Sequence, residues 1–263
     1  MLEFVKFHGL GNDFIIVEGD TSDLGVDEIR RVCRRHRGVG ADGVLFVQPT
    51  DAGVAMVVYN RDGTRPEMCG NGVRCVAAYA VKYMGLDTQM VVDSDAGPRA
   101  CQVERRERHR WDVTVDMGTA QVGGEPGALR IDDRQFEYVD VDMGNPHAVI
   151  FEMPEMELID RLGAQANSPD SPFEEGVNLE FVHQKDDRLE VVVYERGVGR
   201  TRACGTGACA VAAAAWDSGR CPGDESVDVE LPGGVLTIAN RTGQVWMTGP
   251  AQEVFRGQWS SEG

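Results

Sequence analysis

Two short stretches constrain the fold more than any other feature of the sequence. Met68-Cys69-Gly70-Asn71-Gly72 and Ala203-Cys204-Gly205-Thr206-Gly207 each place a cysteine before a Gly-x-Gly turn. An alanine-rich segment follows each turn, over residues 73–84 and 208–216. A turn of small residues that opens a helix presents N–H groups and a partial positive charge, which lowers the pKa of a cysteine placed there. The pattern therefore predicts two reactive cysteines, each at the start of a helix.

The surroundings of the two cysteines repeat as well. Val57-Val58-Tyr59-Asn60-Arg61 precedes Cys69, and Val192-Val193-Tyr194-Glu195-Arg196 precedes Cys204 at the same spacing. Apolar segments and glycine loops follow one another in the same order in both halves of the chain. A period of about 135 residues is far longer than that of a solenoid, so it indicates two similar domains.

We expect the first domain to cover residues 1–117 and the second to cover residues 118–249, with residues 250–263 packing back on the first. The chain has 32 glycines, which favours a β-rich fold with many tight turns. The two alanine-rich helices have no polar stripe, so we expect each to be buried inside its own domain. Two like domains related by a pseudo-two-fold axis would bring both thiols to one cleft.

Local patterns predict the elements of each half. The predicted strands cover residues 3–6, 14–18, 44–48, 55–59, 90–93, 100–105, 111–117, 136–142, 148–151, 178–183, 189–194, 227–231, 235–239 and 245–248. Further helices are predicted over residues 26–35 and 155–162, with Thr21-Ser22-Asp23 as the N-cap region of the former. Gly85 is the predicted stop of the first alanine-rich helix. Residues 123–127 and 165–175 are predicted loops.

Charge excludes some classes of partner. The chain has 26 basic and 43 acidic residues, a formal net charge of −17, so no basic surface is available for nucleic acid. No apolar run is long enough to cross a membrane. The only lysines are Lys6, Lys82 and Lys185. An acidic, lysine-poor surface suggests a halophilic protein, and a GC-rich genome that favours arginine codons is the alternative.

Cysteine usage and the N-terminus indicate the compartment. Met1-Leu2-Glu3-Phe4 has neither the basic region nor the apolar region of a signal peptide, and the number of cysteines is seven. We therefore expect a cytoplasmic protein with free thiols. A lone cysteine is usually a small buried hydrophobe. This structural interpretation applies to Cys33, Cys75, Cys101, Cys209 and Cys221.

The paired helix starts suit inversion of a carbon beside a carboxylate. A carboxylate held by two helix N-termini gains hydrogen bonds and dipole stabilisation from both. One thiolate can then remove the adjacent proton from one face, while the other thiol delivers a proton to the opposite face. Backbone N–H groups of Gly70, Asn71, Gly205 and Thr206 could stabilise the enolate-like carboxylate. This chemistry needs no pyridoxal cofactor and no metal.

Several motifs together carry a resemblance to a known family. They are Phe7-His8-Gly9-Leu10-Gly11-Asn12-Asp13-Phe14, Asn60-x-Asp62-Gly63, Met68-Cys69-Gly70-Asn71-Gly72-x-Arg74-Cys75, Gly144-Asn145-Pro146-His147, Val177-Asn178, Glu195-Arg196-Gly197 and Ala203-Cys204-Gly205-Thr206-Gly207-Ala208. In this set and order the chain resembles diaminopimelate epimerase, from about residue 4 to about residue 250.

The resemblance implies an α+β fold of two pseudo-symmetric domains, each a mostly antiparallel, barrel-like sheet around a central helix. It implies a homodimeric isomerase that interconverts LL- and meso-diaminopimelate in lysine biosynthesis, without pyridoxal phosphate. Cys69 and Cys204 would be the acid/base pair, and His147 and Glu195 would set the thiol protonation states. The residues implied to bind substrate are Asn12 in the cleft, Asn60, Asn145, Asn178 and Arg196 at the distal end, and Gly70, Asn71, Gly205 and Thr206 at the reacting carboxylate.

Three other functions are weighed against this one. A proline or hydroxyproline racemase would use the same two thiols, but Asn71 and Arg196 speak against it, since proline lacks a second carboxylate. A thiol-redox protein is disfavoured because the sequence has no Cys-x-x-Cys. A non-catalytic binding module of the same architecture would not need both thiols.

Overall fold

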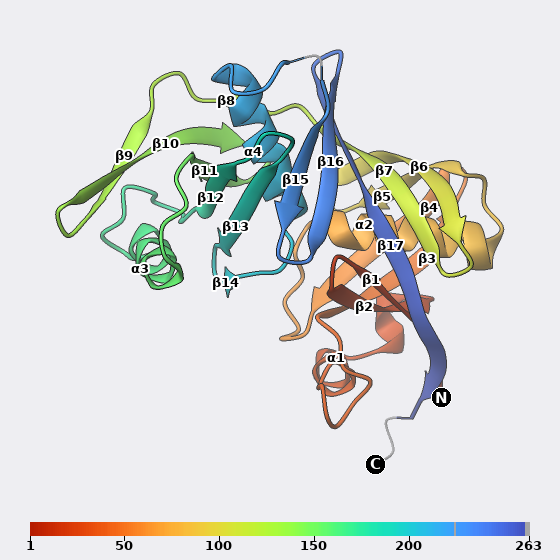
Figure 1. Ribbon diagram of the computed structural model, residues 1–263. Coiled ribbons are helices and arrows are strands. Elements are labelled where there is room, and N and C mark those ends of the chain that lie inside the picture. Colours follow the sequence, from red (N-terminus) through yellow and green to blue (C-terminus); the bar gives the residue numbers. More distant parts are fainter. Residues whose placement is uncertain (224, 261–263) are drawn as a thin grey trace. The chain divides into compact units, whose positions relative to one another are not determined.

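The computed structural model describes residues 1–223 and 225–260 (Figure 1). The chain divides into two compact units, each with its own core. Unit 1 comprises Met1–Asp116 and Thr248–Gly263, so it contains both ends of the chain. Unit 2 comprises Met117–Met247. The expected packing of residues 250–263 on the first half includes residues 261–263, which lie outside the described residues.

Unit 1 is built from the following elements: β1 (Leu2–Gly9), β2 (Asn12–Glu18), the 3₁₀-helix η1 (Thr21–Asp23), α1 (Val26–Val32), β3 (Gly43–Thr50), β4 (Gly53–Asn60), α2 (Gly70–Tyr79), the π-helical turn η2 (Ala80–Met84), β5 (Gln89–Ser94), β6 (Gly97–Glu107), β7 (Arg110–Gly118) and β17 (Gln244–Trp259). β7 and β17 each cross the boundary and begin or end in unit 2.

The strands of unit 1 close into a barrel. Among the described residues, β1 to β7 pair in chain order, and β17 pairs with both β7 and β1. The pairing of β1 with β17 runs from Leu2↔Trp259 to His8↔Gln252. Two neighbouring pairs, β2–β3 and β4–β5, are parallel, and each needs a crossover connection. Helix α1 lies on the first crossover and helix α2 on the second.

Helix α2 fills the barrel of unit 1 (Figure 1). It contacts strands β1 to β6, and all of its residues from Gly70 to Tyr79 are buried. The helix continues through η2 and ends at Gly85, which has a positive φ of 69° and is the left-handed stop that the sequence predicts. The expected burial of the alanine-rich helix is confirmed.

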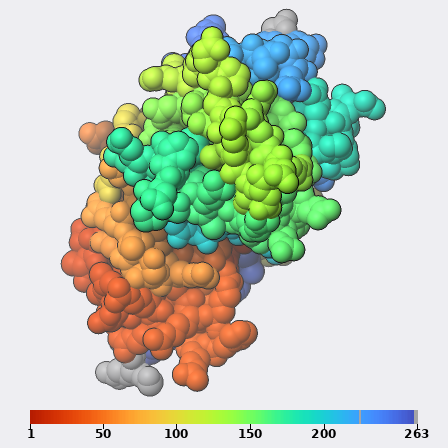
Figure 2. Space-filling view, turned by 90° about the vertical axis from the view of Figure 1, so that its left-hand side faces the viewer, coloured from red at the N-terminus to blue at the C-terminus, as the bar shows by residue number. Residues whose placement is uncertain are grey.

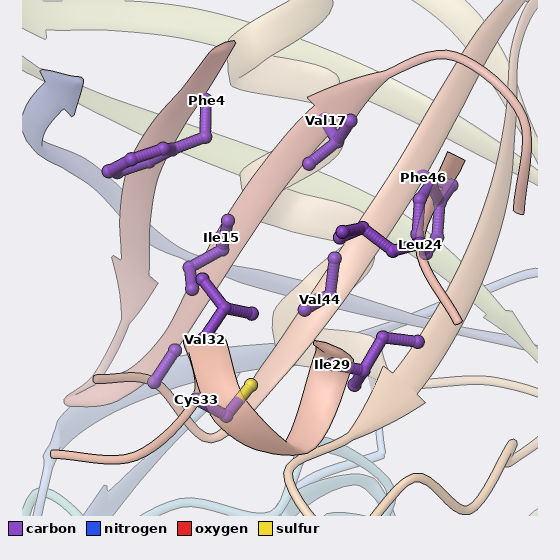
Figure 3. Close-up of a cluster of buried hydrophobic side chains, with 10 residues drawn as sticks. Phe4, Ile15, Val17, Leu24, Ile29, Val32, Cys33, Val44 and Phe46 are labelled. Atoms are coloured by element: carbon purple, nitrogen blue, oxygen red, sulfur yellow. The ribbon is translucent and has the colours of Figure 1, made fainter. Parts of the chain in front are cut away.

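Helix α1 packs on the outside of the sheet. Figure 3 shows Ile29 and Val32 of α1 facing the apolar side chains of Ile15 on β2 and Val44 on β3. Phe4 from β1 belongs to the same cluster. The residues of β1, β2 and β3 alternate between this outer cluster and the barrel interior, so the central parts of these three strands are buried on both faces.

Unit 2 is built from the following elements: β8 (Gln121–Val122), β9 (Gly127–Ile131), β10 (Arg134–Asp142), β11 (Pro146–Ile150), α3 (Met156–Ala166), β12 (Asn178–Gln184), β13 (Leu189–Glu195), β14 (Gly199–Arg200), α4 (Gly205–Asp217), β15 (Val227–Leu231), β16 (Gly234–Arg241) and the first residues of β17. Its strands pair in the order β10-β11-β12-β13, and β13 pairs with both β14 and β15.

Unit 2 repeats the order of unit 1. The pairs β11–β12 and β13–β15 are parallel, with α3 and α4 on their crossovers, as α1 and α2 are in unit 1. Helix α4 contacts β8, β10, β11, β12, β15 and β16. Its residues Gly205 and Gly207–Ala215 are buried. Each unit is therefore a mostly antiparallel, barrel-like sheet around a central helix, and the predicted α+β fold with an internal duplication is confirmed.

Several predicted boundaries are wrong. Thr21–Asp23 does not cap α1 but forms the separate turn η1, in which Asp20 accepts a hydrogen bond from the Ser22 N–H. Helix α1 ends at Val32 instead of residue 35, and α3 runs on to Ala166, into a predicted loop.

Strands were missed where an apolar run is lacking. The Gly/Pro-rich stretch around residue 125 leads directly into β9, which pairs with β10 from Gly127↔Tyr138 to Ile131↔Arg134. This segment alternates exposed and buried residues on the surface of unit 2, where it forms the yellow-green band of Figure 2. Strand β17 continues far beyond the predicted end at residue 248, and this outer part pairs with β1 from His8↔Gln252 to Leu2↔Trp259.

Candidate active site

Cys69 is the N-cap of helix α2. Its backbone is extended, with φ of −142° and ψ of 109°, and Gly70 is the first helical residue. The side chain is partly exposed. The first N–H groups of a helix have no acceptor inside the helix, so the turn from Gly70 to Gly72 presents donors beside the sulfur. The predicted position of Cys69 at a helix start is confirmed.

Asn12 connects Cys69 to the strands of unit 1. It follows the tight turn at Leu10 and Gly11, whose positive φ values of 56° and 83° join β1 to β2. The Asn12 Oδ1 atom lies 3.9 Å from Cys69 Sγ and accepts a hydrogen bond of 3.2 Å from Asn71 Nδ2. Asn12, Cys69 and Asn71 therefore form one polar cluster at the end of α2.

An ion-pair network that the sequence analysis missed holds Asn12. The Asn12 Nδ2 atom donates to Asp42 Oδ2 at 3.1 Å. Arg35 bridges Asp42 and Asp13, with a distance of 2.7 Å to each carboxylate. Lys6 adds a further contact of 2.7 Å to Asp13. Asp42 lies in a glycine loop, so its signal in the sequence is only that of a turn residue.

Two further residues belong to the polar surroundings of Cys69 in unit 1. Asn60 ends β4, and its Nδ2 atom donates to Thr64 Oγ1 at 2.9 Å. Arg74 is fully buried and donates to Asn71 Oδ1 at 2.8 Å and to the Pro250 carbonyl at 3.3 Å. Arg74 thus fixes the first turn of α2 against β17.

Cys204 is the N-cap of helix α4, as Cys69 is of α2. Its φ and ψ are −125° and 114°, and Gly205 is the first helical residue. The sulfur accepts a hydrogen bond from the Gly207 N–H at 3.4 Å and lies 3.5 Å from Thr206 Oγ1. The residue is 8% exposed, so it is more buried than Cys69. Its predicted position at a helix start is confirmed.

The expected low pKa is wrong for Cys204. Burial raises the pKa of its thiol well above the ordinary value, and the charges of Glu195 and Glu180 raise it further. The hydrogen bonds with Thr206 and the Gly207 N–H oppose this rise but are outweighed. A helix N-terminus lowers a thiol pKa only where anionic neighbours and burial do not prevail. The surroundings of Cys204 therefore favour the thiol form.

Glu195 reaches the Cys204 thiol from the end of strand β13. Burial raises the pKa of the Glu195 carboxyl, and hydrogen bonds from Thr201 and Cys204 act in the opposite direction. Thr201 Oγ1 donates to Glu195 Oε1 at 2.5 Å. The structure thus brings Glu195 and Cys204 together.

His147 lies in a buried chain of polar groups. Its Nδ1 atom is 2.7 Å from Glu180 Oε1, and its Nε2 atom is 3.1 Å from Asn145 Oδ1. The side chains of His147 and Glu180 have no exposed surface. Burial raises the pKa of Glu180, although His147 lowers it. The sequence analysis missed Glu180, whose only signal is a charged residue inside the apolar strand 178–183.

Asn178 and Arg196 lie where β11 and β12 begin and β13 ends. The Asn178 side chain donates to the Pro146 carbonyl at 2.9 Å and accepts from the Arg196 backbone N–H at 3.0 Å. The Arg196 guanidinium is exposed and donates to the Glu175 carbonyl at 3.1 Å. Asn178 therefore ties three strand ends together through one contact of its Nδ2 atom and one of its Oδ1 atom.

The remaining cysteines are thiols without catalytic surroundings. Burial raises the pKa of Cys33, Cys75 and Cys101 to about 12 in each case. Cys209 is buried in α4, whereas Cys221 is only partly buried. The structural interpretation of these cysteines is confirmed except for the burial of Cys221.

Among residues 1–223 and 225–260, no group of three or more histidine, cysteine, aspartate or glutamate side chains could hold a metal ion.

No helix in the described part of the chain has the length and apolar character needed to cross a bilayer.

Solved structures of racemases, epimerases and isomerases share this fold. A hydroxyproline epimerase from Agrobacterium vitis aligns with a TM-score of 0.75 and 17% identity, over 100% of this chain and 93% of that one. Methylitaconate-delta-isomerase aligns with a TM-score of 0.68 and 16% identity, over 100% and 99%. At these identities the likeness defines the fold class alone.

Sequence comparison is more specific. The family model described as diaminopimelate epimerase matches residues 4–123 and 139–254. The diaminopimelate epimerase of Desulforudis audaxviator is 42% identical, over 98% of this chain and 99% of its own length. That of Desulfitobacterium hafniense is 40% identical, over 97% of each chain. The chain belongs to the diaminopimelate epimerase family.

Proposed function

We propose that this protein is an isomerase that interconverts LL- and meso-diaminopimelate without a cofactor, using Cys69 and Cys204 as the acid/base pair. The observation that carries the proposal is the duplicated helix start: each unit places one cysteine as the N-cap of a buried central helix. This arrangement occurs in a chain that belongs to the epimerase family over most of its length.

The reaction exchanges one proton for another at a single α-carbon. One sulfur, as thiolate, takes the α-proton and becomes a thiol, and the C–H electron pair moves into the adjacent carboxylate. The other thiol then donates its proton to the opposite face of the same carbon and becomes a thiolate. Proton transfer between positioned groups of suitable pKa is general acid/base catalysis. The two thiols end in exchanged protonation states, and the carbon is inverted.

Helix N-termini stabilise the developing charge. As the α-proton leaves, the substrate carboxylate becomes enolate-like and gains negative charge. Gly70 and Asn71 open α2, and Gly205 and Thr206 open α4, so we propose that their N–H groups bind this carboxylate. The support is their position, since each pair directly follows the cysteine of its unit.

Glu195 and His147 set the protonation states of the thiols in this proposal. Cys204 is buried beside Glu195, which favours the thiol form of Cys204. Cys204 therefore begins a turnover as the acid, and Cys69 begins as the base. The roles are exchanged in the reverse reaction. His147 contributes through the buried chain that links Glu180 to Asn145.

Amide and guanidinium groups hold the part of the substrate that does not react. The proposed residues are Asn60, Asn145, Asn178 and Arg196, whereas Asn12 is proposed to line the substrate cleft. A second amino-acid end carries one ammonium and one carboxylate, and a guanidinium can bind the latter by paired hydrogen bonds. Arg196 is exposed at the end of β13, next to Glu195, and can therefore reach such a group.

We propose that the protein works in lysine biosynthesis, in the cytoplasm and as a homodimer. Light scattering measured as the protein elutes from a size-exclusion column tests the dimer, and the mass should be twice that of the monomer.

The net charge of −17 supports the further proposal that the protein is halophilic. Unfolding followed against KCl concentration tests it, and full stability in dilute buffer would contradict it.

The function is tested by incubating the purified protein with LL-diaminopimelate and no added cofactor. Chromatography that separates the stereoisomers should show the meso form accumulating to equilibrium. Cys69→Ala is the matched control and should leave the substrate unchanged. Racemisation of proline without turnover of diaminopimelate would overturn the proposal in favour of a proline racemase of the same fold.

A further inference from the structure

Glu180 is a charged residue on the inner side of an apolar strand. Its neighbours Leu179 and Phe181 on β12 belong to the outer apolar cluster that packs against α3. The Glu180 side chain points the other way, toward α4: a Cβ added to Gly207 would lie 2.7 Å from Glu180 Oε1. The same Cβ would lie 3.3 Å from Cys204 Sγ. Gly207 therefore leaves the space that Glu180 and the Cys204 sulfur occupy.

Unit 1 fills the equivalent positions with apolar residues. The parallel pairs match in register, with Phe14↔Gly43 in unit 1 and His147↔Asn178 in unit 2. Two residues further along the second strand, Leu45 of β3 corresponds to Glu180 of β12. Leu45 also contacts its helix turn, since a Cβ on Gly72 would lie 3.3 Å from Leu45 Cδ2. The His147–Glu180 pair thus stands where unit 1 has Phe14 and Leu45.

This comparison separates fold from function. The same strand–helix arrangement forms with an apolar pair in unit 1, so the architecture does not require the buried polar pair of unit 2. A buried ionisable pair is costly unless it is well hydrogen-bonded. Glu180 Oε2 has no hydrogen-bond partner among the residues that the structure describes, which adds to that cost. The fold does not need this pair, and the pair is costly to bury. We therefore expect it to have a functional role.

The pair is one end of a chain that leads to Asn145. Oxygen atoms face both ring nitrogens of His147: Glu180 Oε1 at 2.7 Å and Asn145 Oδ1 at 3.1 Å. Asn145 Oδ1 can only accept a hydrogen bond, so His147 Nε2 carries the hydrogen of that contact. A neutral imidazole has one N–H group, so the hydrogen bond between Nδ1 and Glu180 Oε1 uses a second proton, which His147 and Glu180 share. With the Nδ1 side held by Glu180, the Nε2–H group donates to Asn145 Oδ1.

We propose that Glu180 is a positioning residue that holds the His147 ring through Nδ1 and so aims the Asn145 amide at the substrate. With Asn145 Oδ1 bonded to the ring, the Asn145 Nδ2 group turns away from the ring and donates to the distal carboxylate of diaminopimelate. This step rests on the proposed function. The hydrogen bond, and not the negative charge of Glu180, carries the effect.

Three variants test this role. Glu180→Gln keeps a donor for Nδ1, and it should leave the KM for LL-diaminopimelate within about twofold of the original value. Glu180→Leu removes the hydrogen bond and should raise KM about tenfold, the effect of a tenfold weaker binding step. The double variant His147→Phe, Glu180→Leu copies the pair of unit 1, so it should fold with a Tm at least as high as that of the original chain and still show the raised KM.

Glu253→Gln is the matched control. Glu253 is another buried carboxylate, bonded to Tyr83 Oη at 3.0 Å in unit 1, and it belongs to neither half of the site. This variant should lower Tm without changing KM. A KM that is unchanged in Glu180→Leu would overturn the proposal. A KM raised equally in Glu180→Gln and Glu180→Leu would also overturn it, because the charge would then be the important property.

A second measurement does not depend on the substrate. In protein labelled with ¹⁵N-histidine, the His147 Nε2–H signal should exchange slowly with water in the original chain and in Glu180→Gln. It should exchange rapidly in Glu180→Leu, and an equally slow exchange there would contradict the proposal. If no form of the protein converts diaminopimelate, the proposed function fails, and the exchange rates still decide whether Glu180 holds the ring.

Discussion

Glu180 Oε1 lies 2.7 Å from His147 Nδ1, and neither side chain has any exposed surface. The equivalent positions of unit 1 hold Phe14 and Leu45, which are also buried. The two repeats therefore share an architecture and differ in the chemistry beside their central helices. In unit 2 the carboxylate of Glu180 lies beside the first turn of α4, at Gly207. In unit 1 the apolar side chain of Leu45 lies beside the first turn of α2, at Gly72.

Removal of the Glu195 charge should make Cys204 more acidic. A nearby carboxylate disfavours the thiolate, so it adds to the rise in the Cys204 pKa that burial causes. In Glu195→Gln the pKa of Cys204 falls, so Cys204 loses the proton that it must donate at a lower pH than in the original protein. The alkaline limb of the kcat/KM profile should therefore move down by about one pH unit.

Glu190→Gln is the control for this shift. Glu190 lies on the same strand, β13, and pairs with Lys185 at the surface. Its replacement should leave the alkaline limb in place. The electrostatic account of Cys204 would be wrong if Glu195→Gln lowered the rate at every pH without moving this limb.

A methyl group at Gly207 should harm the site more than one at Gly72. In Gly207→Ala the new Cβ would lie 2.7 Å from Glu180 Oε1, which the bond to His147 holds in place. In Gly72→Ala the nearest atom is the end of the flexible Leu45 side chain at 3.3 Å. We expect Gly207→Ala to lose roughly 1–3 kcal/mol of unfolding free energy and most of its kcat.

The matched glycine variants are compared by thermal unfolding and by the rate of epimerisation. Gly72→Ala should remain close to the original protein in both measurements. Equal losses in the two variants would show that the space beside Gly207 is not special.

The ion-pair network beneath Asn12 should contribute stability that depends on pH. Burial alone would raise the pKa of Asp13, but hydrogen bonds from Arg35 and Lys6 prevail and lower it to about 2. A lowered folded-state pKa stabilises the protein above the ordinary value of 3.8, and this contribution is lost as the pH falls toward 2.

Asp13→Asn should therefore reduce the unfolding free energy at neutral pH by about 1–2 kcal/mol, after allowance for partial exposure. The difference between the variant and the original chain should shrink as the pH approaches 2. Asp132→Asn, which breaks an exposed pair with Arg161, is the control and should have little effect. A pH-independent difference for Asp13→Asn would contradict the assignment.

The sequence predicted the two helix starts and the repeat because each depends on local spacing. Cys69 and Cys204 precede small residues that only a tight turn and a helix start accommodate. The same spacing showed that Glu195 corresponds to Asn60, whereas its role at the thiols was implied by the family resemblance. The C-terminal ends of α1 and α3 were less accurate, because the apolar pattern that locates a helix does not mark its last residue.

Other features depend on contacts between distant parts of the chain. Asp42 acquires its role only when the loop after α1 lies against Asn12. The contact of Glu180 with His147 forms only when parallel pairing brings β12 beside β11. The raised pKa of Cys204 arises from burial and from carboxylates on two other strands, so the local helix start suggested the opposite direction.

The central claim is that two thiols invert one α-carbon, and the deuterium content of the product tests it most directly. LL-diaminopimelate is incubated in D₂O with the original protein and with Cys204→Ala, and the first meso product is analysed by NMR and mass spectrometry. The account predicts one deuterium per molecule, on the inverted carbon, and no meso product from a folded Cys204→Ala protein. Meso product that retains the original α-hydrogen, or inversion by Cys204→Ala at a normal rate, would contradict it.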